Sequence, residues 1–137
     1  MPKKKEVQKQ GTKQTILLVE DDEFLANMYK TKLELEKYNV IMASNGESAL
    51  RIINEKELDL ILLDIVLPKI SGFEVITRIK ASKTSKKTPV IMLTNLGQKE
   101  DIEKGLKLGA DEYLIKAHFL PSEVITKIKK LIEKTKK

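Results

Sequence analysis

The sequence of 137 residues contains no cysteine, which excludes disulfide bonds and any metal or redox site built on thiolates. It has no run of about 18 apolar residues that could cross a membrane, and its start lacks the apolar core of a secretory signal peptide. The six glycines form neither GxxxxGK[ST] nor GxGxxG, the usual phosphate-binding loops. We therefore expect a cytoplasmic protein with no membrane segment and no nucleotide-binding loop.

The composition is that of one globular domain, with 41% hydrophobic residues and a net charge of +6. The positive charge lies at the two ends of the chain. Five Lys and one Glu fall in residues 1–14, and six Lys and one Glu fall in residues 127–137, so residues 15–126 carry a net charge of −3. We expect a basic flexible leader at 1–14, one domain at 15–134 and a short basic tail at 135–137.

Apolar runs of strand length alternate with amphipathic helical patterns from residue 15 almost to the end. The expected strands are residues 15–19, 39–43, 59–63, 89–93 and 112–115. The expected helices are residues 23–37, 47–56, 72–82, 98–108 and 122–134. This alternation is typical of βα units, and the continuous apolar strands indicate burial on both faces. The sequence therefore predicts an α/β domain with a doubly wound parallel sheet in three layers.

Polar side chains follow four of the expected strands. They are Glu20, Asp21, Asp22, Asp64, Thr94 and Lys116. The carboxyl ends of parallel strands form the ligand crevice of such a sheet, so we expect these side chains to meet there. Close carboxylates without His or Cys favour Mg²⁺ between them, while a lysine and a hydroxyl suit the oxygens of a phosphoryl group. Asp64 can then act as a nucleophile and form an aspartyl phosphate.

Each of these residues has a simpler interpretation when it is taken alone. The acidic residues 20–22 begin a predicted helix and suit its dipole, and Asp22 is better read as a helix cap than as a ligand. His118, the only histidine, points to no particular chemistry. The site hypothesis is favoured because one placement accounts for several residues at once.

Four segments, ILLVEDDEF, LILLDIVLPKISGFEVI, TPVIMLTN and GADEYLIKA, resemble the sequence blocks of response-regulator receiver domains. The resemblance covers about residues 15–134. It implies a flavodoxin-like (βα)5 fold with strand order 2-1-3-4-5. The rule that ligands bind at the carboxyl ends of the strands applies to sheets of this order. It also implies a place in two-component signalling, as a single-domain type similar to the chemotaxis regulators.

The same resemblance assigns roles to individual residues. Asp64 matches the phosphorylated aspartate, assisted by Thr94 and Lys116, and Thr94 and Tyr113 match the pair that switches conformation. The implied Mg²⁺ ligands are Glu20, Asp21, Asp64 and the backbone carbonyl of Val66. Ala117 departs from the pattern, because the family usually has a proline after a cis bond at that position. The sequence leaves the geometry of this bond open.

A receiver domain is a phosphoacceptor switch and not an enzyme beyond its own phosphotransfer and slow autodephosphorylation. The implied donor is a histidine kinase or histidine phosphotransfer protein. The implied effector contacts the face made by the fourth helix, the fifth strand and the fifth helix, and no direct DNA binding is expected. Two alternatives stay open: an interaction module that works without phosphorylation, and a hydrolase of the haloacid dehalogenase type. The second is disfavoured because Val66 stands where that class needs an acid.

Overall fold

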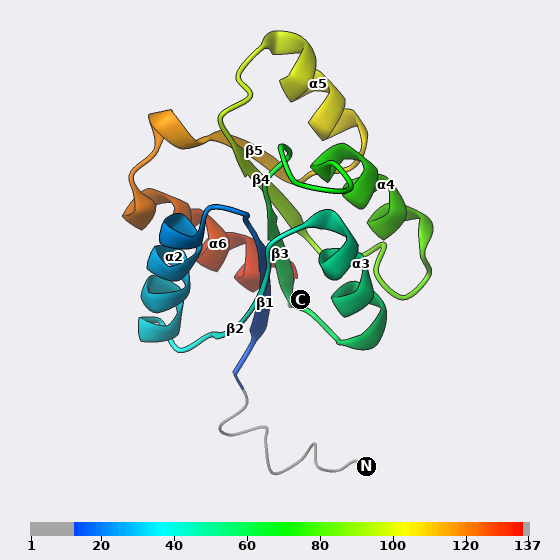
Figure 1. The fold of residues 1–137 in the computed structure, drawn as a ribbon. Helices are drawn as coiled ribbons and strands as arrows, with labels where there is room; N and C mark the ends of the chain where they lie inside the picture. The colour runs from blue at the N-terminus through cyan, green and yellow to red at the C-terminus, as the bar shows by residue number, and fades with distance from the viewer. Residues whose placement is uncertain (1–12, 136–137) are drawn as a thin grey trace.

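The computed structural model describes residues 13–135, so nearly all of the expected leader and the last two residues of the expected tail lie outside it. Five parallel strands form one sheet in the order β2-β1-β3-β4-β5, as predicted. Their bounds are β1 Thr15–Val19, β2 Asn39–Ala43, β3 Leu60–Leu63, β4 Val90–Thr94 and β5 Glu112–Ile115. The sheet stands in the middle of the molecule (Figure 1).

Helices cover both faces of this sheet and complete the three layers. Their bounds are α2 Glu23–Leu35, α3 Gly46–Glu55, α4 Gly72–Ala81, α5 Lys99–Lys107 and α6 Pro121–Thr135. In Figure 1, α2 and α6 lie on one side of the sheet, and α3, α4 and α5 lie on the other. The predicted three-layer α/β architecture is confirmed.

The three inner strands, β1, β3 and β4, are almost entirely apolar because each contributes to two cores. Ile16 and Leu18 of β1 pack into the core under α2 and α6. Leu17 and Val19, which point the opposite way, pack into the core under α3 and α4. Alternate residues of a strand face opposite sides of a sheet, so a sheet covered on both faces needs no polar alternation.

The expected helix 23–37 ends two residues early, at Leu35, for a reason that the structure makes plain. Lys37 has a φ of 73°, outside the helical range. Its amide donates to the carbonyl of Glu34, and the amide of Tyr38 donates to the carbonyl of Leu33. This is a Schellman motif, formed here without the glycine that usually marks it.

Two further differences from the sequence analysis lie at the carboxyl edge of the sheet. The expected strand 89–93 is shifted by one residue, so Thr94 is the last residue of β4. A short 3-10 helix, η1 Lys116–His118, directly follows β5 and was not expected. The described residues contain no cis peptide bond, so the bond before Ala117 is trans.

Gly72, the first residue of α4, fixes how closely this helix approaches the end of β3. Its amide donates to the carbonyl of Ile65 at 2.8 Å. A Cβ placed on Gly72 would lie 2.2 Å from the carbonyl oxygen of Asp64 and 2.6 Å from the Cα of Ile65. Both contacts are with backbone atoms that cannot turn away. The start of α4 therefore packs directly on the backbone that carries Asp64.

We predict that Gly72→Ala lowers the free energy of unfolding by about 3 kcal/mol, because the new methyl group overpacks against backbone. Gly97→Ala is the matched control, since the nearest atom to its Cβ would be the Cδ1 of the Ile115 side chain, at 3.2 Å. We expect the control to change stability by less than about 1 kcal/mol. Urea unfolding of the two variants measures the difference, and equal losses would contradict the close packing of α4.

Candidate functional site

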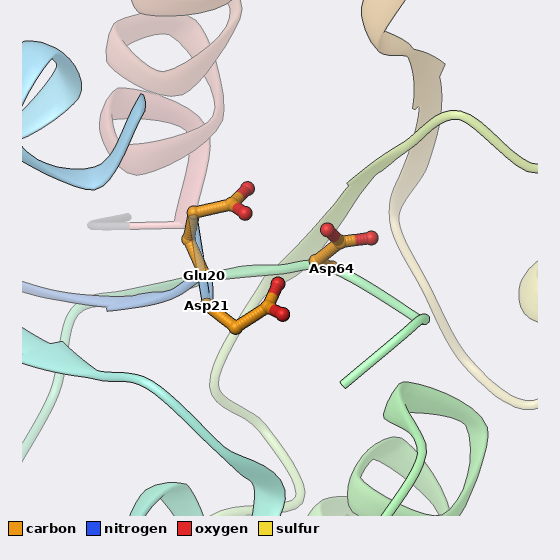
Figure 2. A group of neighbouring side chains, drawn as sticks. All are labelled: Glu20, Asp21 and Asp64. Carbon is orange, nitrogen blue, oxygen red and sulfur yellow. The ribbon is translucent and has the colours of Figure 1, made fainter. Parts of the chain in front are cut away.

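Three carboxylates meet at the carboxyl edge of the sheet. Glu20 and Asp21 follow β1, and Asp64 follows β3. The two strands are neighbours, with Val19 beside Leu63, so the residues after them lie side by side. One oxygen from each carboxylate lies within 4.8 Å of the other two. Figure 2 shows the three side chains projecting into the same space.

Backbone hydrogen bonds hold the residues of this acidic cluster in place. The amide of Asp64 donates to the carbonyl of Val19 at 3.1 Å, which continues the β1–β3 pairing one step past the strand. The side chain of Glu20 accepts from the amide of Asp22 at 3.0 Å. Asp22 itself caps α2 by accepting from the amide of Leu25, as expected for a cap and not a ligand. The cluster is thus set by the ends of two strands and the start of one helix.

Lys116 brings a positive charge between two of these carboxylates. Its Nζ lies 2.7 Å from Oε1 of Glu20 and 2.8 Å from Oδ2 of Asp64. Both carboxylate side chains are buried, whereas that of Lys116 is 16% exposed. Burial raises the pKa of Glu20, against the opposing effect of Lys116. Burial also acts to lower the pKa of Lys116, but its bonds to Asp64 and Glu20 outweigh that effect and raise it.

Thr94 and Tyr113 are connected through the backbone of Leu96. The amide of Leu96 donates to Oγ1 of Thr94 at 3.4 Å. The hydroxyl of Tyr113 donates to the carbonyl of Leu96 at 2.7 Å. Thr94 is completely buried. Burial, followed by the negative charges of Asp101 and Asp64, raises the pKa of Tyr113 to about 12.

Most of the residues singled out in the sequence therefore gather at one edge of the sheet. Val66 lies in the loop after β3, with a side chain that is 62% exposed. The ion pair between Glu20 and Lys116 and the use of the Leu96 backbone were not predicted from the sequence. Gly105 was assigned no role either, although a glycine in the middle of an amphipathic helix is a visible signal of close packing.

The donor set of the acidic cluster fits a hard divalent cation. All of its ligand atoms are carboxylate oxygens, which Mg²⁺ prefers to nitrogen or sulfur. Asp21 is exposed and has no ion-pair partner within residues 13–135. The second carboxylate oxygens of Glu20 and Asp64 accept from the amides of Asp22 and Ile65, and each keeps a lone pair that a cation can use. These three residues are the ones that could hold the ion.

The chain is a doubly wound α/β domain with an acidic cluster at the carboxyl edge of its sheet, where such domains bind their ligands. Residues 16–129 match the family described as the response regulator receiver domain. That match covers well over half of the chain. The chain therefore belongs to the response-regulator receiver family of two-component signalling, whose members are signalling regulators.

Among curated proteins, the chain is similar to the transcriptional regulatory protein CpxR of Escherichia coli (strain K12). The two are 42% identical over 120 residues, which make up 88% of this chain and 50% of CpxR. A probable transcriptional regulator, ycf27 of Guillardia theta, is 36% identical over 92% of this chain and 48% of its own length. The chain thus spans about half the length of these curated relatives.

Solved structures agree with the observed fold. A CheY-like receiver domain protein from Methanospirillum hungatei JF-1 superposes with a TM-score of 0.85 at 29% identity, covering 91% of this chain and 98% of that one. The receiver domain of the sensor histidine kinase PA1611 from Pseudomonas aeruginosa PAO1 has a TM-score of 0.81 at 30% identity, covering 89% and 99%. That domain was solved with a magnesium ion coordinated in its active-site cleft.

None of the helices within residues 13–135 has the length and apolar character needed to cross a bilayer.

We predict that Mg²⁺ raises the thermal unfolding midpoint of the wild-type protein and that Asp21→Asn removes most of this rise. At ten times its dissociation constant, a ligand of the folded state stabilises by about 1.4 kcal/mol. Asp22→Asn is the matched control, because asparagine caps a helix as well as aspartate does. Calorimetry with and without magnesium chloride measures the effect, and an equal rise in all three proteins would place the ion elsewhere.

Proposed function

We propose that this chain is a phosphoacceptor switch that receives a phosphoryl group on Asp64, with Mg²⁺ bound beside it. The observation that carries the proposal is the position of Asp64, between two acidic residues and the amine of Lys116 at 2.8 Å. A phosphoryl group on this carboxylate would find metal ligands on one side and a cation on the other. The magnesium ion in the PA1611 receiver domain supports the same assignment.

The proposed transfer is an in-line displacement at phosphorus. An oxygen of the Asp64 carboxylate forms a bond to phosphorus while the bond to the donor nitrogen breaks, and the nitrogen keeps the electron pair. When bound by Glu20, Asp21, Asp64 and the carbonyl of Val66, Mg²⁺ supplies positive charge to the oxygens of the phosphoryl group. The donor we propose is a phosphohistidine on a histidine kinase or a histidine phosphotransfer protein.

Lys116 and Thr94 complete the binding of the phosphoryl group in this proposal. The Nζ of Lys116 contacts Oδ2 of Asp64, so a small movement takes the amine from the carboxylate to a phosphoryl oxygen. The hydroxyl of Thr94 can act as a donor, since its hydrogen bond with Leu96 uses it only as an acceptor. The Thr94 hydroxyl thus has a hydrogen to donate to the new charge, and the Lys116 amine has one N–H besides the two that bond to Glu20 and Asp64.

The output surface we propose is the face formed by α5, β5 and α6. Drawing the Thr94 hydroxyl toward the phosphoryl group vacates space beside Tyr113, whose hydroxyl bonds to the carbonyl of Leu96. The ring then favours one of two packings, which biases this face between two states. The partner that reads it is a downstream effector protein.

Asp64 should be the only phosphorylated residue. Incubation with acetyl phosphate and Mg²⁺ should add one acid-labile phosphoryl group, which intact-mass measurement detects. Asp64→Asn should abolish this addition, because an amide oxygen is a far poorer nucleophile than a carboxylate. The control Asp22→Asn changes a neighbouring carboxylate outside the cluster and should be labelled like the wild type. Labelling of Asp64→Asn, or labelling that survives a chelator, would refute the assignment.

Loss of the phosphoryl group should be slow. Hydrolysis needs a water molecule in line with phosphorus. The side chains proposed to flank the site, those of Val66 and Leu96, are apolar and cannot hydrogen-bond to such a water. The double variant Val66→Asn, Leu96→Glu should therefore lose phosphate roughly tenfold faster, because polar groups there can orient the water. The decay of phosphorylated protein in excess Mg²⁺ measures this, with Leu35→Glu as a surface control. Equal rates in all three would show that these positions do not control the water.

A further inference from the structure

Gly105 lies in the interior of α5, where a glycine disfavours the helix relative to alanine because it adds backbone freedom to the unfolded chain. No side chain caps the first turn of this helix, although Glu100 and Asp101 at its start and Lys107 at its end suit the helix dipole. Gly105 is also the one buried residue of α5. The presence of a glycine here must be explained by how α5 packs against the sheet.

The reason is the close approach of two side chains from β4 and β5. A Cβ on Gly105 would lie 2.7 Å from Cδ2 and 2.9 Å from Cε2 of Tyr113. It would also lie 2.9 Å from the sulfur of Met92. Met92 pairs with Tyr113 in the sheet, so both side chains reach the same patch of helix backbone. The missing side chain leaves a recess, the Gly105 recess, which the edge of the Tyr113 ring fills.

Among the groups around the Gly105 recess, the ring of Tyr113 is the one that can yield. Met92 is completely buried, whereas Tyr113 is only partly buried. The preceding residue of α5, Lys104, places its amine 4.4 Å from the centre of the Phe73 ring on α4, and this contact holds α5 against α4. A methyl group in the recess would therefore turn the ring outward and break its hydrogen bond to Leu96.

We propose that Gly105 is a positioning residue for the switch, because its recess lets the Tyr113 ring hold the position in which its hydroxyl bonds to the Leu96 carbonyl. This inference rests on the proposed function in one respect, namely that this ring position accompanies phosphorylation. The recess then sets how stable the phosphorylated form is, although Gly105 touches neither Asp64 nor the phosphoryl group.

The position of the ring is tested first, without any phosphoryl group. In protein with isotope-labelled tyrosine rings, a soluble gadolinium chelate should broaden the Tyr113 ring signals more strongly in Gly105→Ala than in the wild type. Glu103→Ala, an exposed substitution on the same helix, should leave them unchanged. Equal broadening in Gly105→Ala and the wild type would overturn the proposal.

The effect on the switch is tested by titration with beryllofluoride and Mg²⁺, a stable mimic of the phosphoryl group. Affinity should fall by about tenfold in Gly105→Ala, since the clash acts on one of the two ring positions. In a Tyr113→Ala background, the same substitution should cause no further loss. An unchanged affinity in Gly105→Ala, or an equal loss with and without the Tyr113 ring, would overturn the role of the recess.

The outcomes separate this inference from the proposed function. If the wild-type protein binds no beryllofluoride, the proposed function fails, and the ring measurement still decides whether the Gly105 recess places Tyr113. If Gly105→Ala does not fold but Gly105→Ala, Tyr113→Ala does, the clash lies at the ring, as proposed. If both fail to fold, the recess has a purely structural role and the proposal is wrong.

Discussion

The ion pairs of Lys116 with Glu20 and Asp64 are the interaction on which the rest of the site depends. Two buried carboxylates at one sheet edge repel each other, and each would favour its neutral form unless a cation lay nearby. Lys116 supplies that cation from the end of the outer strand β5, which is separated from β3 by β4. The strand order and the parallel register are therefore what allow these side chains to meet.

The packing around Asp64 explains why its carboxylate can be placed accurately. Its amide bonds to Val19 on β1, and its carbonyl lies against the backbone of Gly72 at the start of α4. A nucleophile in a displacement at phosphorus must lie in line with the bond that breaks, so small errors in its position lower the reaction rate. Here the neighbouring strand and the following helix both fix the backbone, and the amide of Ile65 and the amine of Lys116 hold the two carboxylate oxygens.

The fold was predictable because its signals are periodic and strong. Apolar strands alternating with amphipathic helices indicate a doubly wound sheet, and the crevice rule then brings together residues that are 96 positions apart, such as Glu20 and Lys116. The early end of α2 at Leu35 and the short helix η1 carried no such signal. The left-handed turn at Lys37 lacks the usual glycine, and η1 covers only three residues.

The sequence predicted which residues form the site better than it predicted the contacts between them. Which carboxylates Lys116 bonds to depends on rotamers and on burial, and neither follows from spacing along the chain. The approach of α5 to β5 depends on a distance between two elements, and a single glycine at position 105 is its only trace. The chemical roles of the gathered residues remain those proposed, and the phosphorylation and titration experiments decide them.

The main chain and the side chain of Leu96 have different roles. Its amide and carbonyl connect Thr94 to Tyr113, while its side chain is one of the two that we propose to flank the phosphoryl group. Every amino acid except proline supplies the same amide and carbonyl, so substitutions here can change how long a signal lasts without cutting its transmission. Substitutions at this one position can therefore alter the duration of the response while the backbone connection to Tyr113 is kept.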